Sequence, residues 1–262
     1  MKKFIYYFKI WWMMSRNSFL VTASKKRVIA LFLFTKVIRF IFFFGFLYYI
    51  LQSTKTLAGY SQVQVIFFFL TFNVVDIIPQ FLFREVYRFR SLIVSGDFDL
   101  ILVKPVNALF RSLMGGADVI DLILLVPLIL IVIYTGGLLS PNGPQVLLYM
   151  ILVLNALIIA AAFHIAVLGL GIITFEVDHT ILIYRDLKNL GRLPIDIYAQ
   201  PLQGLLTYLV PVGIMITFPA KALMGLLSPW GALSSFLFAA TSIFLSLKFW
   251  KFALRKYSSA SS

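Results

Sequence analysis

The sequence contains no cysteine and only two histidines, which excludes disulfides and thiolate metal sites. No Gly-x-x-x-x-Gly-Lys-Ser/Thr motif is present, so the chain has no P-loop of its own to hold ATP phosphates. The zinc-protease motif His-Glu-x-x-His and the hydrolase motif Gly-x-Ser-x-Gly are also absent. We therefore expect no catalytic site, no metal site and no cofactor bound by this chain.

The sequence also lacks the amino-acid composition of a soluble globular domain. Of the 262 residues, 61% are hydrophobic and the mean hydropathy is +0.97, whereas a soluble domain is about half apolar or less. The excess lies in runs of about 20 residues, the length that crosses a bilayer as a helix. These features predict one all-α polytopic membrane domain over residues 1–262, with no separate soluble domain.

Acidic residues are scarce, with 10 Asp and Glu against 23 Lys and Arg. In a soluble chain a net charge of +13 would suggest a nucleic-acid partner, but here the cations gather at the ends of apolar runs. That distribution indicates positive-inside topology, with both termini in the cytoplasm and an even number of spans, most simply six. Lys9 and Arg16 interrupt the first apolar residues, so no cleavable signal peptide is expected.

The apolar runs predict the helices. Residues 1–27 mix basic and aromatic side chains, which is typical of a helix lying in the membrane interface and in contact with lipid. Spans are expected at 30–51, 63–83, 119–138, 145–173 and 231–252. Between the last two, 201–227 contains Pro201, Pro211 and Pro219, which predicts either a re-entrant pair of helices or one kinked span.

The longest stretch that does not suit a bilayer is 84–114. Within it, Gly96 and Pro105 bracket a piece of about two helical turns, and both residue types break helices. Asp97 and Asp99 stand where the N-terminus of a helix favours negative charge. The stretch therefore predicts a short charged helix on the cytoplasmic side, exposed so that it contacts a partner.

The second span carries Asn73, Asp76 and a predicted kink at Pro79. An intramembrane carboxylate is a functional candidate that faces other helices. The alternative is that Asp76 lies close enough to the cytoplasmic end to pair with Arg84 or another basic residue.

The segment 176–199 is amphipathic when it is drawn as a helix. Arg185, Lys188 and Arg192 share one face of a helix, with apolar residues opposite. One interpretation is a cytoplasmic surface helix; the other is a short fifth span whose cations line a water-filled path.

Two blocks of sequence resemble a known family. Gly96-Asp97-Phe98-Asp99-Leu100, followed by Lys104-Pro105-Val106, is similar to a cytoplasmic signature of the membrane subunits of ATP-binding-cassette exporters of the type-2 permease class. The second block reads Gly191-Arg192-Leu193-Pro194-Ile195-Asp196-Ile197-Tyr198, and is followed by Leu206-Thr207, Val210-Pro211 and Phe218-Pro219-Ala220. The resemblance extends over nearly the whole chain, in order and spacing.

The resemblance implies a permease that pairs with a second copy or a related chain in the plasma membrane, such as a bacterial inner membrane. A separate cytoplasmic ATPase would bind ATP and Mg²⁺ and drive export of an amphipathic, lipid-like or drug-like substrate. The 84–114 stretch would then contain the coupling helix, with ATPase contacts at Gly96, Asp97, Phe98, Asp99, Leu100, Lys104 and Pro105. The family frame also makes 178–195 the fifth span and 201–227 a re-entrant extracellular element. Separately, Pro79, Pro194, Pro211 and Pro219 are expected to be structural breaks.

A substrate path is the remaining expectation, with Asn73, Asp76, Arg185, Lys188 and Arg192 as candidates. The cations would attract anionic head groups; alternatively they pair with Asp186, Asp196 or lipid phosphate. Two other functions remain open at this stage. One is an ion-coupled secondary transporter that uses Asp76, although such proteins usually show internal repeats and none is visible. The other is a membrane-embedded lipid enzyme, for which no polar residues cluster.

Overall fold

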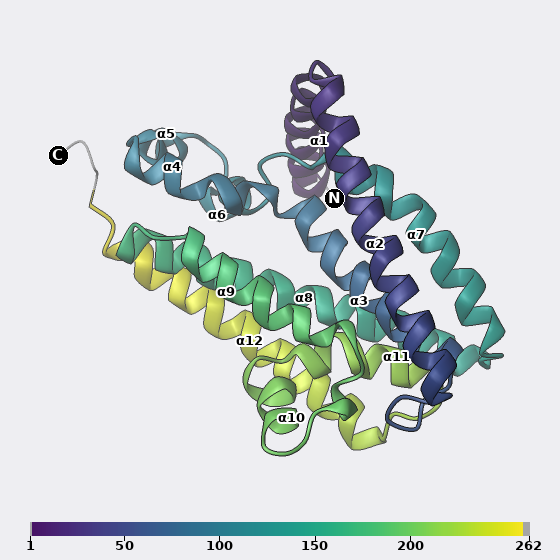
Figure 1. The fold of residues 1–262 in the computed structure, drawn as a ribbon. Helices are drawn as coiled ribbons and strands as arrows, with labels where there is room; N and C mark the ends of the chain where they lie inside the picture. The colour runs from purple at the N-terminus through teal and green to yellow at the C-terminus, as the bar shows by residue number, and fades with distance from the viewer. Residues whose placement is uncertain (1, 259–262) are drawn as a thin grey trace.

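The structure, a computed structural model, describes residues 2–258 and is helical over that range, without strands (Figure 1). Five helices are long and apolar enough to cross a membrane: α2 (Lys26–Thr54), α3 (Gln62–Leu82), α7 (Val119–Leu138), α8 (Gly143–Thr174) and α12 (Pro229–Arg255). They confirm the prediction of an all-α polytopic membrane protein. Of the five, α3 is the most enclosed, because α2, α7, α8 and α11 all pack against it.

A sixth crossing depends on a bent pair of segments. The first is α10 (Leu202–Gly204) with the π-helical η4 (Leu205–Leu209), and the second is η5 (Gly213–Thr217), also π-helical, with α11 (Phe218–Leu223). The two halves meet at an angle of 76°. Pro211 lies at the bend, where its missing N–H leaves no hydrogen bond to continue the helix. Counted as one span, the pair raises the number from five to six.

The predicted fifth span is not one continuous helix. It consists of α9 (Asp178–Asn189) and two short turns, η2 (Leu190–Arg192) and η3 (Ile195–Ile197), with Pro194 between the turns. A helix of 12 residues rises roughly 18 Å, which is less than the ~30 Å core of a bilayer. That the whole of 178–195 crosses the membrane therefore stays a prediction.

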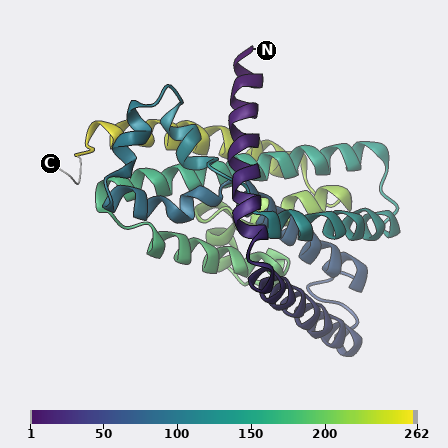
Figure 2. The same cartoon turned by 90° about the horizontal axis from the view of Figure 1, so that it is seen from above.

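The N-terminal helix α1 (Lys2–Ala23) runs across the direction of the long helices, as Figure 2 shows. Only Ser15 is buried, and most of the aromatic side chains are exposed. The Ser15 hydroxyl accepts a hydrogen bond from the backbone N–H of Ala117 at 3.2 Å, which holds α1 against the start of α7. A helix with exposed rings and cations fits the predicted place in the membrane interface.

The predicted cytoplasmic stretch forms four short helices: η1 (Arg84–Arg88), α4 (Phe89–Val94), α5 (Asp97–Val103) and α6 (Ala108–Leu113). They lie at the same end of the bundle as the C-terminal end of α12 (Figure 1). Gly96 separates α4 from α5 with φ of 77°, a left-handed conformation that favours glycine. The charged helix expected between Gly96 and Pro105 is α5, and the structure adds a helix on either side of it.

At the opposite end of the bundle, the carboxylate of Asp196 links three segments. Asp196 accepts hydrogen bonds from the Tyr60 hydroxyl at 2.9 Å, the Lys221 ammonium at 2.8 Å and the Gln203 amide at 3.3 Å. These three donors come from the loop before α3, from α11 and from α10. The Asp196 cluster therefore ties the bent pair to the start of α3.

The closest helix pair is α8 and α12, which run side by side in the same direction (Figure 1). The Asn155 amide donates to the Ser235 hydroxyl at 2.7 Å and to its carbonyl at 3.0 Å. Further along, a Cβ added to Gly169 would lie 2.8 Å from the ring of Phe249. Gly169 thus permits the close approach of the two helices, as small residues do in membranes.

We expect Gly169→Leu to push Phe249 and α12 away from α8 and to destabilise the fold by about 1–3 kcal/mol, the usual cost of overpacking. Thermal unfolding in mild detergent, followed by size-exclusion chromatography, measures the change. Gly45→Ala on α2 is the control, because nothing lies within 4 Å of its added Cβ. An unchanged midpoint for Gly169→Leu would contradict the tight contact.

Candidate functional site

The main candidate site is a cavity of about 450 Å³ between α2, α3, α7, α9 and η2. Its lining combines aromatic and aliphatic side chains with five charged groups. The lining residues are Lys36, Val37, Arg39, Phe40, Phe43, Phe69, Phe72, Asn73, Asp76, Ile77, Gln80, Leu124, Pro127, Leu128, Ile131, Arg185, Asn189 and Arg192. Cavities of this size and mostly apolar character are typical of sites for small molecules.

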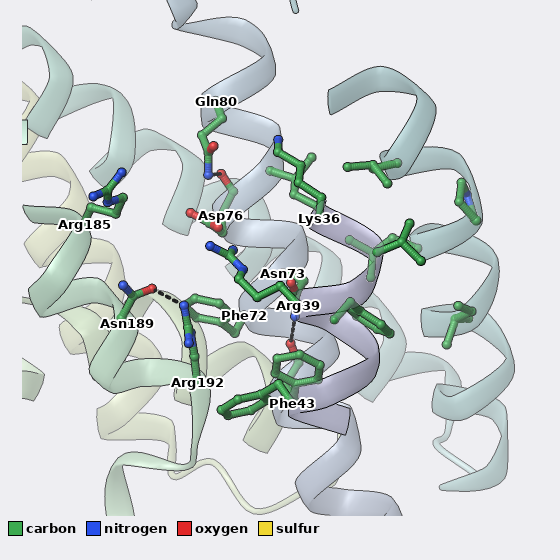
Figure 3. A pocket seen from close by; sticks show the side chains of 18 residues that line it. Lys36, Arg39, Phe43, Phe72, Asn73, Asp76, Gln80, Arg185, Asn189 and Arg192 are labelled. Carbon is green, nitrogen blue, oxygen red and sulfur yellow. Dashed lines mark hydrogen bonds between the residues drawn. The ribbon is translucent and has the colours of Figure 1, made fainter. Parts of the chain in front are cut away.

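Figure 3 shows how the polar groups enter the cavity from three sides. Lys36 and Arg39 come from α2, and Arg39 extends toward the side where α9 lies. Asp76 comes from α3, while Arg185 and Arg192 come from α9 and η2. Neither of the two cations on α2 was assigned to a site from the sequence, so their part in the cavity is new.

Asp76 is already paired. It is 6% exposed and forms an ion pair with the ammonium of Lys188, which is 4% exposed. The partner is therefore a basic residue, as one interpretation held, but it is Lys188 of α9 and not Arg84, whose guanidinium lies 3.2 Å from Asp118. Removing two charges from water is costly unless they meet, so this pair holds α9 against α3.

A second lysine near the cavity also forms an ion pair. Lys36 of α2 pairs with Asp121 of α7, a residue that is 0% exposed. This pair links the two helices that enclose the other side of the cavity. Both carboxylates in or beside the cavity are thus neutralised by lysines.

The arginines have no such partner. Arg39, Arg185 and Arg192 form no ion pair within 4.0 Å to any carboxylate of residues 2–258. Arg192 donates to the Asn189 side-chain oxygen at 3.0 Å (Figure 3). Its guanidinium also lies over the rings of Phe43 and Phe72, with distances of 5.5 and 5.8 Å to the ring centres. Such cation–π contacts hold the guanidinium in place without cancelling its charge.

The predicted path residues therefore divide into two groups. Asn73, Asp76, Arg185 and Arg192 line the cavity. Lys188 forms the ion pair with Asp76 and lies outside the lining. Asn73 donates its amide to the carbonyl of Phe69 on its own helix, at 2.7 Å. Neither Asp186 nor Asp196 pairs with these cations, and Asp196 binds Lys221. Sequence reasoning did not place Arg39 here, although a cation inside an apolar helix is itself a signal of function.

The residues predicted to couple to the ATPase lie in α5 and directly on either side of it. Phe98 is 0% exposed and packs edge-on against Phe89 and Tyr257, with ring centres 5.1 Å apart in both pairs. It therefore joins α5 to its own chain, and the expectation that it contacts a partner is not supported by its burial. By contrast, Leu100 and Val103 are 57% and 79% exposed, and Lys104 and Pro105 are exposed beside them.

The two acidic residues of α5 have local roles as well. Asp97 accepts a hydrogen bond from the Ser95 hydroxyl at 2.7 Å, which caps the turn at Gly96. Burial together with the neighbouring Asp99 carboxylate raises the pKa of Tyr257 to about 12, so the phenol stays neutral. Asp99 therefore lies close to Tyr257, which follows α12.

The predicted breaks lie at different kinds of position. Pro194 separates η2 from η3, and Pro211 separates η4 from η5. Pro219 is near the start of α11, where the helix changes from π to α. Pro79 lies inside α3, three residues before its end, and the helix continues through it.

Comparison with known proteins gives one finding that decides the family. The model of the family described as "ABC-2 family transporter protein" matches residues 33–261. The chain belongs to this ABC-2 family. No curated protein and no solved structure matches it significantly. The family consists of membrane subunits of ATP-binding-cassette transporters, so this chain is a transport subunit that works with an ATP-binding partner.

We expect Asp76→Asn to destabilise this ABC-2 protein by about 3–5 kcal/mol, because it leaves the Lys188 ammonium buried without a counter-charge. The double variant Asp76→Asn/Lys188→Met should recover most of the loss, since it removes both charges. Thermal unfolding in detergent provides the measurement.

The control for the pair is Glu176→Gln. Glu176 is half exposed and its carboxylate lies 3.5 Å from Arg90, so the change should cost no more than about 1 kcal/mol. Equal losses in Asp76→Asn and in the double variant would contradict the buried pair.

Proposed function

We propose that the protein is the permease of an exporter in which two permease chains form the path and separate ATPase subunits drive it. In this proposal the ATPase binds ATP and Mg²⁺ in the cytoplasm, and the permease crosses the plasma membrane with both termini on the cytoplasmic side. The substrate is amphipathic, lipid-like or drug-like. Family membership supports the transporter and its ATP-binding partner; the remaining points are our proposal.

The observation that carries this proposal is the exposed surface of α5. Leu100 and Val103 expose their apolar side chains next to Lys104 and Pro105, outside the membrane-crossing helices. Val94, at the end of α4, adds a further exposed apolar side chain at 58%. Neighbouring apolar residues with a charged rim are typical of a surface that binds another protein.

The same helix is fixed firmly to the membrane part, as transmission of motion requires. Phe98 lies against Phe89 and Tyr257, and its ring centre is 6.4 Å from that of Trp250 in α12. A push on α5 therefore moves packed side chains that reach α12, because close-packed interiors transmit strain.

A second connection runs to the cavity. η1 follows α3 after one residue, and its Glu85 accepts a hydrogen bond from Arg111 of α6 at 2.8 Å. Arg84 lies 3.2 Å from Asp118, the residue before α7. Since α3 and α7 line the cavity, rigid-body motion at the cytoplasmic end would reach its walls. The alternative of ion coupling through Asp76 is disfavoured, because the Lys188 ammonium already occupies that carboxylate.

We expect Leu100→Asp/Val103→Asp to abolish co-purification of the ATPase with the tagged permease, since two charges would enter an apolar contact. The measurement is a pull-down from mild detergent followed by an ATP hydrolysis assay. Leu226→Asp is the matched control, because Leu226 is 52% exposed in the loop before α12.

The control variant should retain the ATPase. Size-exclusion profiles of all three proteins show whether each is folded. Retention of the ATPase by a folded Leu100→Asp/Val103→Asp variant would place the docking surface elsewhere, and no ATPase on the wild type would reject the proposal.

A further inference from the structure

The cavity contains three positive charges that the protein itself leaves without a counter-charge. The arginines come from different elements: Arg39 from α2, Arg185 from α9 and Arg192 from η2. The two lysines nearby are both paired, Lys36 with Asp121 and Lys188 with Asp76. Within residues 2–258 these two lysines thus meet carboxylates, whereas the three arginines line the cavity without an ion pair.

We propose that Arg39, Arg185 and Arg192 bind the anionic group of an amphiphile whose apolar part lies against the aromatic wall. A guanidinium stays charged at every physiological pH and presents a planar set of donors that fits carboxylate or phosphate oxygens. Arg192 uses one donor on Asn189 and keeps the others. Three such groups around one space supply the charge and the hydrogen bonds that a phosphate or carboxylate needs.

The rest of the wall selects against small inorganic anions. Phe40, Phe43, Phe69 and Phe72 line the cavity with Leu128 and other aliphatic side chains, and this surface gains only from an apolar ligand. An uncharged amphiphile would fill the space but leave the three guanidinium groups without an anionic partner. One class of ligand fits both the three arginines and the apolar wall. It consists of an apolar chain or ring system that carries a carboxylate or phosphate.

The occupant could come from two sources with this shared chemistry: an exported amphiphile or the head group of an anionic phospholipid. That the occupant is cargo rests on the proposed function, whereas binding of the anion does not. Binding to the permease alone therefore tests the site, and ATP hydrolysis by the permease–ATPase complex tests the link to transport.

The first experiment measures binding of dansyl-labelled undecanoate, a fluorescent carboxylate amphiphile, to the permease in phosphatidylcholine nanodiscs. We expect dodecyl phosphate to displace the probe and dodecanol, which has the same chain without the charge, to compete far less. The variant Arg39→Gln/Arg185→Gln/Arg192→Gln should bind the probe at least about tenfold more weakly, the order expected from the loss of charge-assisted hydrogen bonds. Replacement of the same residues by Lys should restore part of the affinity.

The control removes three cations outside the cavity, with Lys25→Gln/Lys26→Gln/Lys251→Gln, and should bind as the wild type does. All three lysines are exposed. Equal affinity in the arginine variant and the wild type, with both folded by size-exclusion chromatography, would overturn the proposal. Equal competition by dodecanol and dodecyl phosphate would also overturn it, because the charge would then contribute nothing.

The source of the anion is decided by adding phosphatidylglycerol to the nanodiscs. Competition by this lipid would identify a phospholipid head group as an occupant, and no competition would identify a single-chain amphiphile; either result keeps the anion site. In the complex with the ATPase, dodecyl phosphate should raise ATP hydrolysis by the wild type but not by the arginine variant, when each protein is compared with its own rate without ligand. Binding without any effect on hydrolysis would count against the proposed transport role and not against the site.

Discussion

Two ion pairs with buried carboxylates, Lys188–Asp76 and Lys36–Asp121, connect the helices that surround the cavity. A charge in an apolar environment is tolerated only when a partner meets it, so Lys188 draws α9 to Asp76 on α3 and Lys36 draws α2 to Asp121 on α7. The cavity lies between these two fastened pairs. The cavity carries a net positive charge for the same reason. Lys188 and Lys36 pair with Asp76 and Asp121, and Arg39, Arg185 and Arg192 form no ion pair.

At the end of the bundle where α5 lies, the exposed apolar residues that we propose as the ATPase surface occur next to residues packed against the long helices. The two kinds of residue lie on opposite sides of α5. Phe98 and Ile101 are buried against the protein, whereas Leu100 and Val103 are exposed. This is the ordinary pattern of a two-sided short helix. It explains why a motif of adjacent residues contains both structural and surface positions.

Much of the fold could be predicted from the sequence, because long apolar runs, Gly96 and the proline-rich 201–227 stretch act locally. The cavity could be predicted only in part. Spacing placed Arg185, Lys188 and Arg192 on one face of a helix, but which cation meets Asp76 depends on residues 112 positions apart. Likewise, nothing local distinguishes buried Phe98 from exposed Leu100, since their difference arises from contacts with α4 and with the C-terminal end of the chain.

The Asp196 cluster has a consequence for the end of the bundle opposite α5. One carboxylate holds a tyrosine, a lysine and an amide from three separate segments. If one segment withdrew, the shared carboxylate would lose its geometry for the remaining donors, which lie in partly buried surroundings. The three segments are therefore energetically coupled, because withdrawal of one would weaken the hold of Asp196 on the other two.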